Sequence, residues 1–148
     1  MAAALDNSGL PATQLELEIT ESAVMEHPDE AIRILQQLND RGIQLAMDDF
    51  GTGYSSLSYL KLFPIDHLKI DRSFVKDIEV DLNDRAIALG TIALAHGLDL
   101  KVIAEGVETE FQLSLLASHQ CDEVQGYYFS KPLDANAATL YLRGMTRL

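Results

Sequence analysis

The chain has 148 residues, of which 47% are hydrophobic and 7% aromatic, and its formal net charge at pH 7 is −12. A chain of this size and composition predicts one domain with a substantial core and excludes a disordered protein. The acidic balance argues against a general DNA- or RNA-binding protein, because phosphate backbones are bound by clustered lysine and arginine. An anionic ligand would therefore need a local source of positive charge, and a divalent cation is the simplest source.

Cys121 is the single cysteine of the sequence, so no disulfide can form within the chain. A protein without disulfides is typical of a reducing compartment, and we expect a cytoplasmic location. No apolar stretch is long enough to span a bilayer, and the amino terminus lacks the basic flank of a secretory signal. We therefore expect no membrane segment in this chain.

The first half of the chain begins with a predicted strand at residues 15–19, where acidic and apolar residues alternate. A helix is predicted from Pro28, a favoured first position, to Arg41, and Gly42 ends it. The strand Ile43 to Asp48 follows directly. It leads into a glycine-containing loop.

The second half continues the alternation of helices and strands. Thr109 and Gln112 have the spacing of a capping box, which predicts a helix from there to about His119. The other predicted elements are a short helix from Ser55 to Leu62 closed by Pro64, a strand around Leu68 and Ile70, a long helix from about Asn83 to His96 ended by Gly97, a strand from Leu100 to Ala104, one or two short strands within Asp122 to Ser130, and a closing helix from Asp134.

This order of elements predicts an α/β fold with parallel strands joined by helical crossovers, either as a barrel or as an open sheet. Residues two apart in a strand share a face, and the apolar face belongs against the helices. The polar face then points to a barrel axis, which favours the barrel. On this register five polar residues gather at the carboxyl ends of the strands: Glu18, Asp48, Lys69, Glu105 and Gln125.

Asp48 and Asp49 stand side by side at the end of an apolar run. Adjacent acids at a strand end repel one another unless a cation lies between them, which predicts a metal site. A helix cap or a surface turn is the alternative for the pair alone. For the whole gathering, the alternative is a buried polar network that only fixes strand register.

The number of strands does not reach that of a complete barrel. Eight βα units typically need roughly 250 residues, and this chain has five or six predicted strands. The sequence therefore predicts an incomplete (β/α)8 barrel whose first units are missing from the amino-terminal side. The four histidines are isolated and are predicted to be surface or cap residues rather than zinc ligands.

Five segments of the sequence together resemble the EAL-domain family, and their order and spacing match over almost the whole chain. They are Leu-Glu-Ile-Thr-Glu at 17–21, Asp-Asp-Phe-Gly-Thr-Gly at 48–53, Leu-Lys-Ile-Asp at 68–71, Ile-Ala-Glu-Gly-Val-Glu at 103–108 and Gln-Gly-Tyr-Tyr-Phe-Ser-Lys-Pro at 125–132. The resemblance implies a (β/α)8 barrel that hydrolyses the bacterial second messenger cyclic di-GMP to linear pGpG with Mg²⁺ or Mn²⁺. Some members of the family have lost this activity and serve as ligand receptors or docking modules.

The resemblance also implies roles for individual residues. The metal ligands would be Glu18, Asp48, Asp49 and Glu105, with Asp48 bridging two ions. Lys69 would hold the attacking water, and Glu105, besides binding metal, is a candidate for the general base. The supporting or substrate-binding residues would be Glu21, which anchors the loop after Asp49, together with Asp71, Glu108 and Gln125.

The segment that bears the family's Glu-Ala-Leu signature is absent from this sequence, as is the next strand with its metal-binding asparagine. We therefore expect a single partial EAL domain over residues 1–148, inactive or impaired by itself. An incomplete barrel exposes a strand edge, so we also expect self-association or pairing with the missing amino-terminal segment. A non-catalytic sensing or interaction module is the alternative function.

Overall fold

The computed structural model describes residues 5, 7–51 and 57–145. Its centre is a sheet of parallel strands in the order β1-β2-β3-β4-β5, so that neighbours along the chain are neighbours in the sheet. This order and the helix between successive strands are those of a (β/α)8 barrel, here with part of the barrel wall. The strands are β1 (Glu16–Thr20), β2 (Gln44–Phe50), β3 (His67–Ile70), β4 (Lys101–Glu105) and β5 (Glu123–Gln125).

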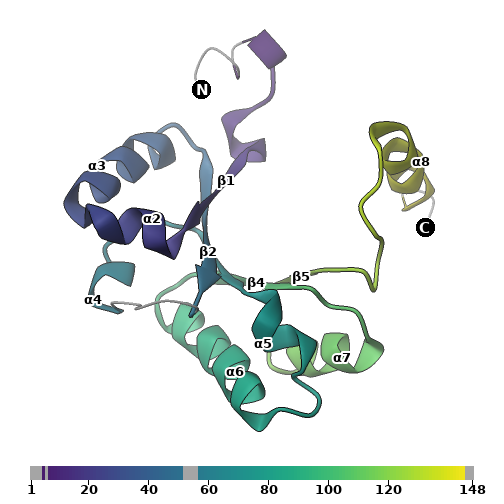
Figure 1. The fold of residues 1–148 in the computed structure, drawn as a ribbon. Coiled ribbons are helices and arrows are strands. Elements are labelled where there is room, and N and C mark those ends of the chain that lie inside the picture. Colours follow the sequence, from purple (N-terminus) through teal and green to yellow (C-terminus); the bar gives the residue numbers. More distant parts are fainter. Residues whose placement is uncertain (1–4, 6, 52–56, 146–148) are drawn as a thin grey trace.

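The sheet curves, and the helices that connect its strands lie on the convex side (Figure 1). α8 stands apart from them beyond β5, after an extended segment. Among the described residues, no helix is long and apolar enough to cross a membrane. The helices are η1 (Ala12–Gln14), α2 (Glu21–Glu26), α3 (Pro28–Asn39), α4 (Leu57–Leu60), α5 (Arg72–Lys76), α6 (Leu82–Gly97), α7 (Glu110–Ser118) and α8 (Ala135–Met145).

The structure confirms the predicted alternation, including the capping box at the start of α7. The predicted end of α6 was wrong by one residue, because Gly97 belongs to the helix and the left-handed conformation falls on Asp99. Three short helices, η1, α2 and α5, were not predicted. Part of the predicted helix between residues 55 and 62 lies outside the described residues.

The core is densest around the central strand. All four residues of β3 are buried, because β2 and β4 flank the strand and side chains cover both of its faces. Leu68 and Ile70 pack into the apolar layer under the helices. His67 and Lys69 occupy the opposite face, as strand alternation requires.

Two aspartates at the amino-terminal end of the sheet accept hydrogen bonds from backbone N–H groups in the same manner. Asp66 Oδ2 accepts a hydrogen bond from the Leu45 N–H (2.8 Å), and Asp122 Oδ2 accepts one from the Val102 N–H (2.9 Å). Each aspartate comes just before or at the start of one strand and satisfies a buried N–H of the preceding one. Asp122 also lies 2.9 Å from His96 Nε2.

The pKa of Asp122 reflects these contacts. Burial acts to raise it, but the hydrogen bonds from His96 and from the Val102 N–H outweigh burial, so that the pKa lies below its ordinary value. The carboxylate therefore contributes stability that is present above the ordinary pKa of 3.8 and is lost as the pH falls through the lower pKa of the folded state.

We expect Asp122→Ala to lower the free energy of unfolding at pH 7 by about 1–2 kcal/mol, because it leaves the buried Val102 N–H without its acceptor. The difference from the unsubstituted chain should shrink as the pH falls below 3.8. Urea unfolding at several pH values measures this. The exposed Asp77→Ala is the control, and an equal loss in both variants would contradict the assignment.

Candidate functional site

The ammonium group of Lys69 lies among three carboxylates. Lys69 Nζ is 2.6 Å from Glu18 Oε1 on β1, 3.2 Å from Asp48 Oδ1 on β2 and 2.5 Å from Glu105 Oε1 on β4. The Lys69 side chain is only 3% exposed, whereas the Glu18 side chain is 49% exposed. The cluster therefore has a buried base, at the Lys69 ammonium, and a solvent-exposed rim, at Glu18.

Strand register brings these side chains together. Glu18 pairs with Ala46, Ala46 with His67, and Lys69 with Ile103 in the parallel ladder. Asp48 lies two positions beyond Ala46, Lys69 two beyond His67 and Glu105 two beyond Ile103. Since parallel strands end at the same edge of a sheet, these side chains reach a common point there. The predicted gathering of Glu18, Asp48, Lys69 and Glu105 at one mouth is confirmed.

The pKa of Lys69 lies above its ordinary value. Burial opposes the charged form, but the hydrogen bonds to Glu105 and Glu18 and the contact with Asp48 more than offset it. A buried ammonium with three anionic neighbours stays protonated at neutral pH. Lys69 is therefore a permanent hydrogen-bond donor at the base of the cluster.

Asp48 and Asp49 have different surroundings. Asp48 Oδ1 is buried and has no hydrogen-bond partner among the described residues, although Lys69 Nζ is nearby. Asp49 adopts a left-handed conformation with φ of 57°, and the register of β2 against β3 shifts between Met47 and Phe50. This irregularity departs from the strict alternation that would place adjacent side chains on opposite faces.

The pKa of Asp49 is raised above its ordinary value. Burial contributes most, and the neighbouring charges of Asp48 and Asp71 add to it, while Lys69 acts in the opposite direction. Asp49 is thus close enough to Asp48 and Lys69 to interact electrostatically with both. The carboxylates in this part of the structure outnumber the single ammonium of Lys69, so the cluster has an excess of negative charge.

Glu105 has a second partner. Gln125 at the end of β5 donates a hydrogen bond from Nε2 to Glu105 Oε1 at 2.6 Å. Gly126 follows, and a Cβ at that position would collide with the backbone of Val107. The backbone of β5 therefore lies directly against the segment that follows Glu105, which holds Gln125 and Glu105 together.

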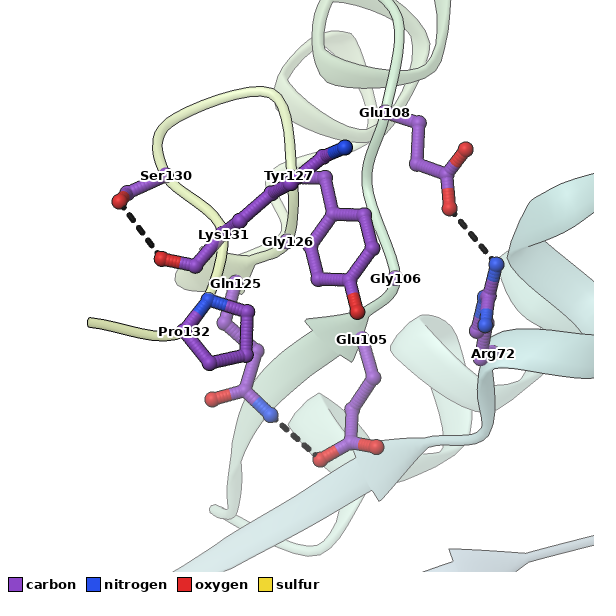
Figure 2. A pocket seen from close by; sticks show the side chains of 10 residues that line it. All are labelled: Arg72, Glu105, Gly106, Glu108, Gln125, Gly126, Tyr127, Ser130, Lys131 and Pro132. Atoms are coloured by element: carbon purple, nitrogen blue, oxygen red, sulfur yellow. Dashed lines mark hydrogen bonds and ion pairs between the residues drawn. The ribbon is translucent and has the colours of Figure 1, made fainter. Parts of the chain in front are cut away.

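A pocket of about 420 Å³ opens beside Glu105 and Gln125 (Figure 2). The Glu105–Gln125 hydrogen bond and an ion pair between Arg72 and Glu108 (2.7 Å) lie at separate points of its lining. Lys131 lies over the ring of Tyr127. The pocket thus combines acidic, basic and aromatic groups, and its residues are Arg72, Glu105, Gly106, Glu108, Gln125, Gly126, Tyr127, Ser130, Lys131 and Pro132.

The other predicted residues lie outside the Lys69 cluster. Glu21 is buried at the start of α2, and the loop that it is predicted to anchor lies partly outside the described residues. Asp71 caps α5 by accepting hydrogen bonds from the Ser73 N–H and hydroxyl. Burial acts to raise the pKa of Asp71, but these bonds lower it overall. Glu108 reaches the pocket and pairs with Arg72.

The prediction for His67 as a surface or cap residue was wrong. His67 is 5% exposed, and its Nδ1 lies 2.6 Å from Glu16 Oε2. The pair repeats the Lys69–Glu18 pattern two residues earlier on the same two strands. His119, in contrast, follows α7 as its carboxyl-terminal cap residue, as predicted.

Sequence analysis did not single out Arg72, Tyr127 or Lys131 as pocket residues. Asp71-x-Ser73 is a recognisable cap that could have predicted α5 and hence the position of Arg72. The partner of Arg72 is 36 positions away, and no local pattern connects the two. Tyr127 and Lys131 follow β5 in an irregular segment, where the spacing of residues does not indicate which way their side chains point.

The donor chemistry of the cluster suits a divalent cation. Carboxylate oxygens are the ligands that Mg²⁺ and Mn²⁺ prefer, and Asp48 Oδ1 is a buried oxygen without a hydrogen-bond partner among the described residues. Within residues 5, 7–51 and 57–145, no three acidic, histidine or cysteine side chains are already spaced as ligands of one ion. The nearest oxygens instead converge on the Lys69 ammonium.

Comparison with known proteins places these features in a family. The sequence profile of the EAL domain matches residues 1–132. A protein of Pseudomonas aeruginosa named "Cyclic di-GMP phosphodiesterase NbdA" is 51% identical over 140 residues, which are 95% of this chain and 18% of that protein. The chain spans about one fifth of the length of the curated relatives that it matches.

Solved structures agree in fold. A structure titled "PaMucR Phosphodiesterase, c-di-GMP complex" has a TM-score of 0.89 and 43% identity, covering 93% of this chain and 56% of that chain. A manganese and cy-diGMP complex of BlrP1 from Klebsiella pneumoniae has a TM-score of 0.79 and 37% identity, covering 88% of this chain and 33% of that chain.

We expect Lys69→Met to lower the free energy of unfolding at pH 7 by about 2–3 kcal/mol, because three carboxylates would face one another without the central cation. Glu18→Gln should cost less than about 1 kcal/mol, since its side chain is half exposed and solvent screens the pair. Thermal and urea unfolding of both variants test this. A Lys69→Met variant as stable as the unsubstituted chain would contradict it.

Proposed function

Because this chain belongs to the EAL domain family, we propose that its residues form part of the active site of a cyclic di-GMP phosphodiesterase that yields linear pGpG. The observation that carries the proposal is the meeting of Glu18, Asp48 and Glu105 around Lys69. A structural network needs no open rim, whereas hydrolysis of an anionic diester needs acids, a fixed cation and access from solvent.

The residues that would hold Mg²⁺ or Mn²⁺ are Glu18, Asp48, Asp49 and Glu105. Asp48 would be shared between the ions, and its Oδ1 is buried at 3.2 Å from the Lys69 ammonium. The ions, when bound, supply Lewis-acid stabilisation of the charge that develops on the phosphodiester. They also account for ligand binding by a chain with a net charge of −12.

Lys69 and Glu105 would act on the attacking water. The ammonium of Lys69 has three N–H donors and three carboxylate neighbours, so one of these contacts would give way for it to donate a hydrogen bond to that water or to a phosphate oxygen. Glu105 accepts hydrogen bonds from Lys69 and from Gln125, which orient its carboxylate toward the rim. From there it can take up the proton of the water.

The supporting residues have distinct parts in this proposal. Gln125 orients Glu105, and Glu108 lines the pocket where the nucleotide would lie. Asp71 fixes the start of α5 directly after β3. Glu21 would anchor the loop that follows Asp49.

The chain would supply one part of a single EAL domain. β1 lies at an edge of the sheet, and the strands that would continue the barrel beyond it are not among the described elements. We infer that the 148 residues alone are inactive or impaired and associate with another copy or with the amino-terminal segment of the domain. We propose a cytoplasmic location for the same protein.

The experiment is hydrolysis of cyclic di-GMP with Mg²⁺ or Mn²⁺, measured as release of pGpG by the chain alone and by the complete EAL domain that contains it. We expect activity in the complete domain, little or none in the chain alone, and a loss of at least about 100-fold with Asp48→Asn, which removes a shared ligand.

Asp29→Asn on the outer surface of α3 is the matched control and should keep full activity. Binding of cyclic di-GMP without turnover by the complete domain would overturn the proposal. It would establish a sensing module instead.

A further inference from the structure

Arg72 packs against the backbone directly after Glu105. Gly106 has a left-handed conformation with φ of 71°, and a Cβ at this position would collide with Arg72 Cγ and lie 2.9 Å from Arg72 Cβ and Cδ. The aliphatic stem of Arg72 thus occupies the space that any side chain at residue 106 would need. Glycine at residue 106 thus permits the close approach of the Arg72 stem to the backbone.

The guanidinium of Arg72 makes a second contact with the same segment. Arg72 Nη2 donates a hydrogen bond to Glu108 Oε1 at 2.7 Å (Figure 2). The Glu108 N–H donates to Gln112 Oε1 at 2.6 Å, and Gln112 Nε2 donates to the Lys76 carbonyl at 3.1 Å. Residues 106–109 are therefore fastened to both the first and the last residue of α5.

These contacts connect the segments that follow the two closest partners in the cluster. Arg72 comes three residues after Lys69, and Gly106 comes directly after Glu105, whose carboxylate is 2.5 Å from the Lys69 ammonium. The side chains of Arg72 and Glu108 are 56% and 40% exposed. Such an exposed pair contributes little to global stability, so its effect lies in local geometry.

We propose that Arg72 is a positioning residue that clamps residues 106–109 to α5 and thereby holds the Glu105 carboxylate on Lys69. Its importance for catalysis rests on the function proposed above, whereas the clamp itself is a property of this chain. The stem and the charge of Arg72 act together. Lysine can replace both in part, methionine can replace the stem alone, and alanine can replace neither.

The test compares Arg72→Ala, Arg72→Met and Arg72→Lys with Arg33→Met, which removes another exposed, ion-paired arginine on the distant helix α3. Amide exchange at Val107 and Glu108, measured by NMR without metal, should rise about tenfold in Arg72→Ala and less in Arg72→Met. Arg72→Lys should stay within about twofold of the unsubstituted chain, and Arg33→Met should not change exchange there.

Calorimetric titration with Mn²⁺ alone gives a second measurement. We expect Arg72→Ala to weaken Mn²⁺ binding about fivefold and Arg72→Lys to restore most of it, at melting temperatures close to that of Arg33→Met. Unchanged exchange in Arg72→Ala, or faster exchange with unchanged Mn²⁺ affinity, would overturn the proposal. Should the 148-residue chain alone bind no Mn²⁺, the titration is made with the complete EAL domain; if that domain also binds none, the proposed function fails, and the exchange measurement alone decides whether the clamp exists.

Discussion

A buried ammonium group that needs negative partners organises the mouth of this sheet. Lys69 lies on a strand whose residues are all buried, so its charge must be balanced within the protein. Glu18, Asp48 and Glu105 provide that balance from β1, β2 and β4, on which they stand at staggered positions in the strand register. The cluster exists only if these strands pair in the observed register, and so the fold and the site depend on one another.

Acidic side chains have different partners at the two ends of the sheet. At the amino-terminal end, the carboxylates of Asp66 and Asp122 accept hydrogen bonds from backbone N–H groups that would otherwise be buried without an acceptor. At the carboxyl-terminal end, the acids outnumber the nearby cation, because Glu18, Asp48 and Glu105 share the single ammonium of Lys69. Surplus negative charge at an open rim is the physical reason why the proposed metal site lies at this end rather than at the other.

Much of this arrangement could be predicted from the sequence because alternation within a strand is a local property. It placed Glu18, Asp48, Lys69 and Glu105 at one mouth, and it located β1 to β4 to within one or two residues, whereas β5 was predicted only as one or two short strands within a longer segment. It did not show that Lys69 would lie at the centre, because the stagger between neighbouring strands decides which oxygens reach its ammonium. The burial of His67 was missed for a similar reason, since covering both faces of β3 requires the whole sheet.

The contacts across the pocket were beyond sequence analysis. Arg72 and Glu108 belong to loops after different strands, and their pairing depends on the close approach of the Arg72 stem to Gly106. Asp71 was predicted as a supporting residue, and the structure shows it as the cap of a short helix that hydrophobic periodicity could not reveal. Local patterns thus identified the strands and the acids, whereas the second layer of contacts required the coordinates.

The central claim is that Lys69 is enclosed by carboxylates, and the exchange of its ammonium protons with water measures this most directly. In a chain labelled with ¹⁵N-lysine, NMR at neutral pH should show one ammonium that exchanges slowly, assigned by Lys69→Arg, while the exposed Lys61, Lys76, Lys101 and Lys131 exchange rapidly. Added Mn²⁺ should broaden the Lys69 signal before the others. Equal exchange at all lysines, or broadening of exposed lysines first, would contradict the account.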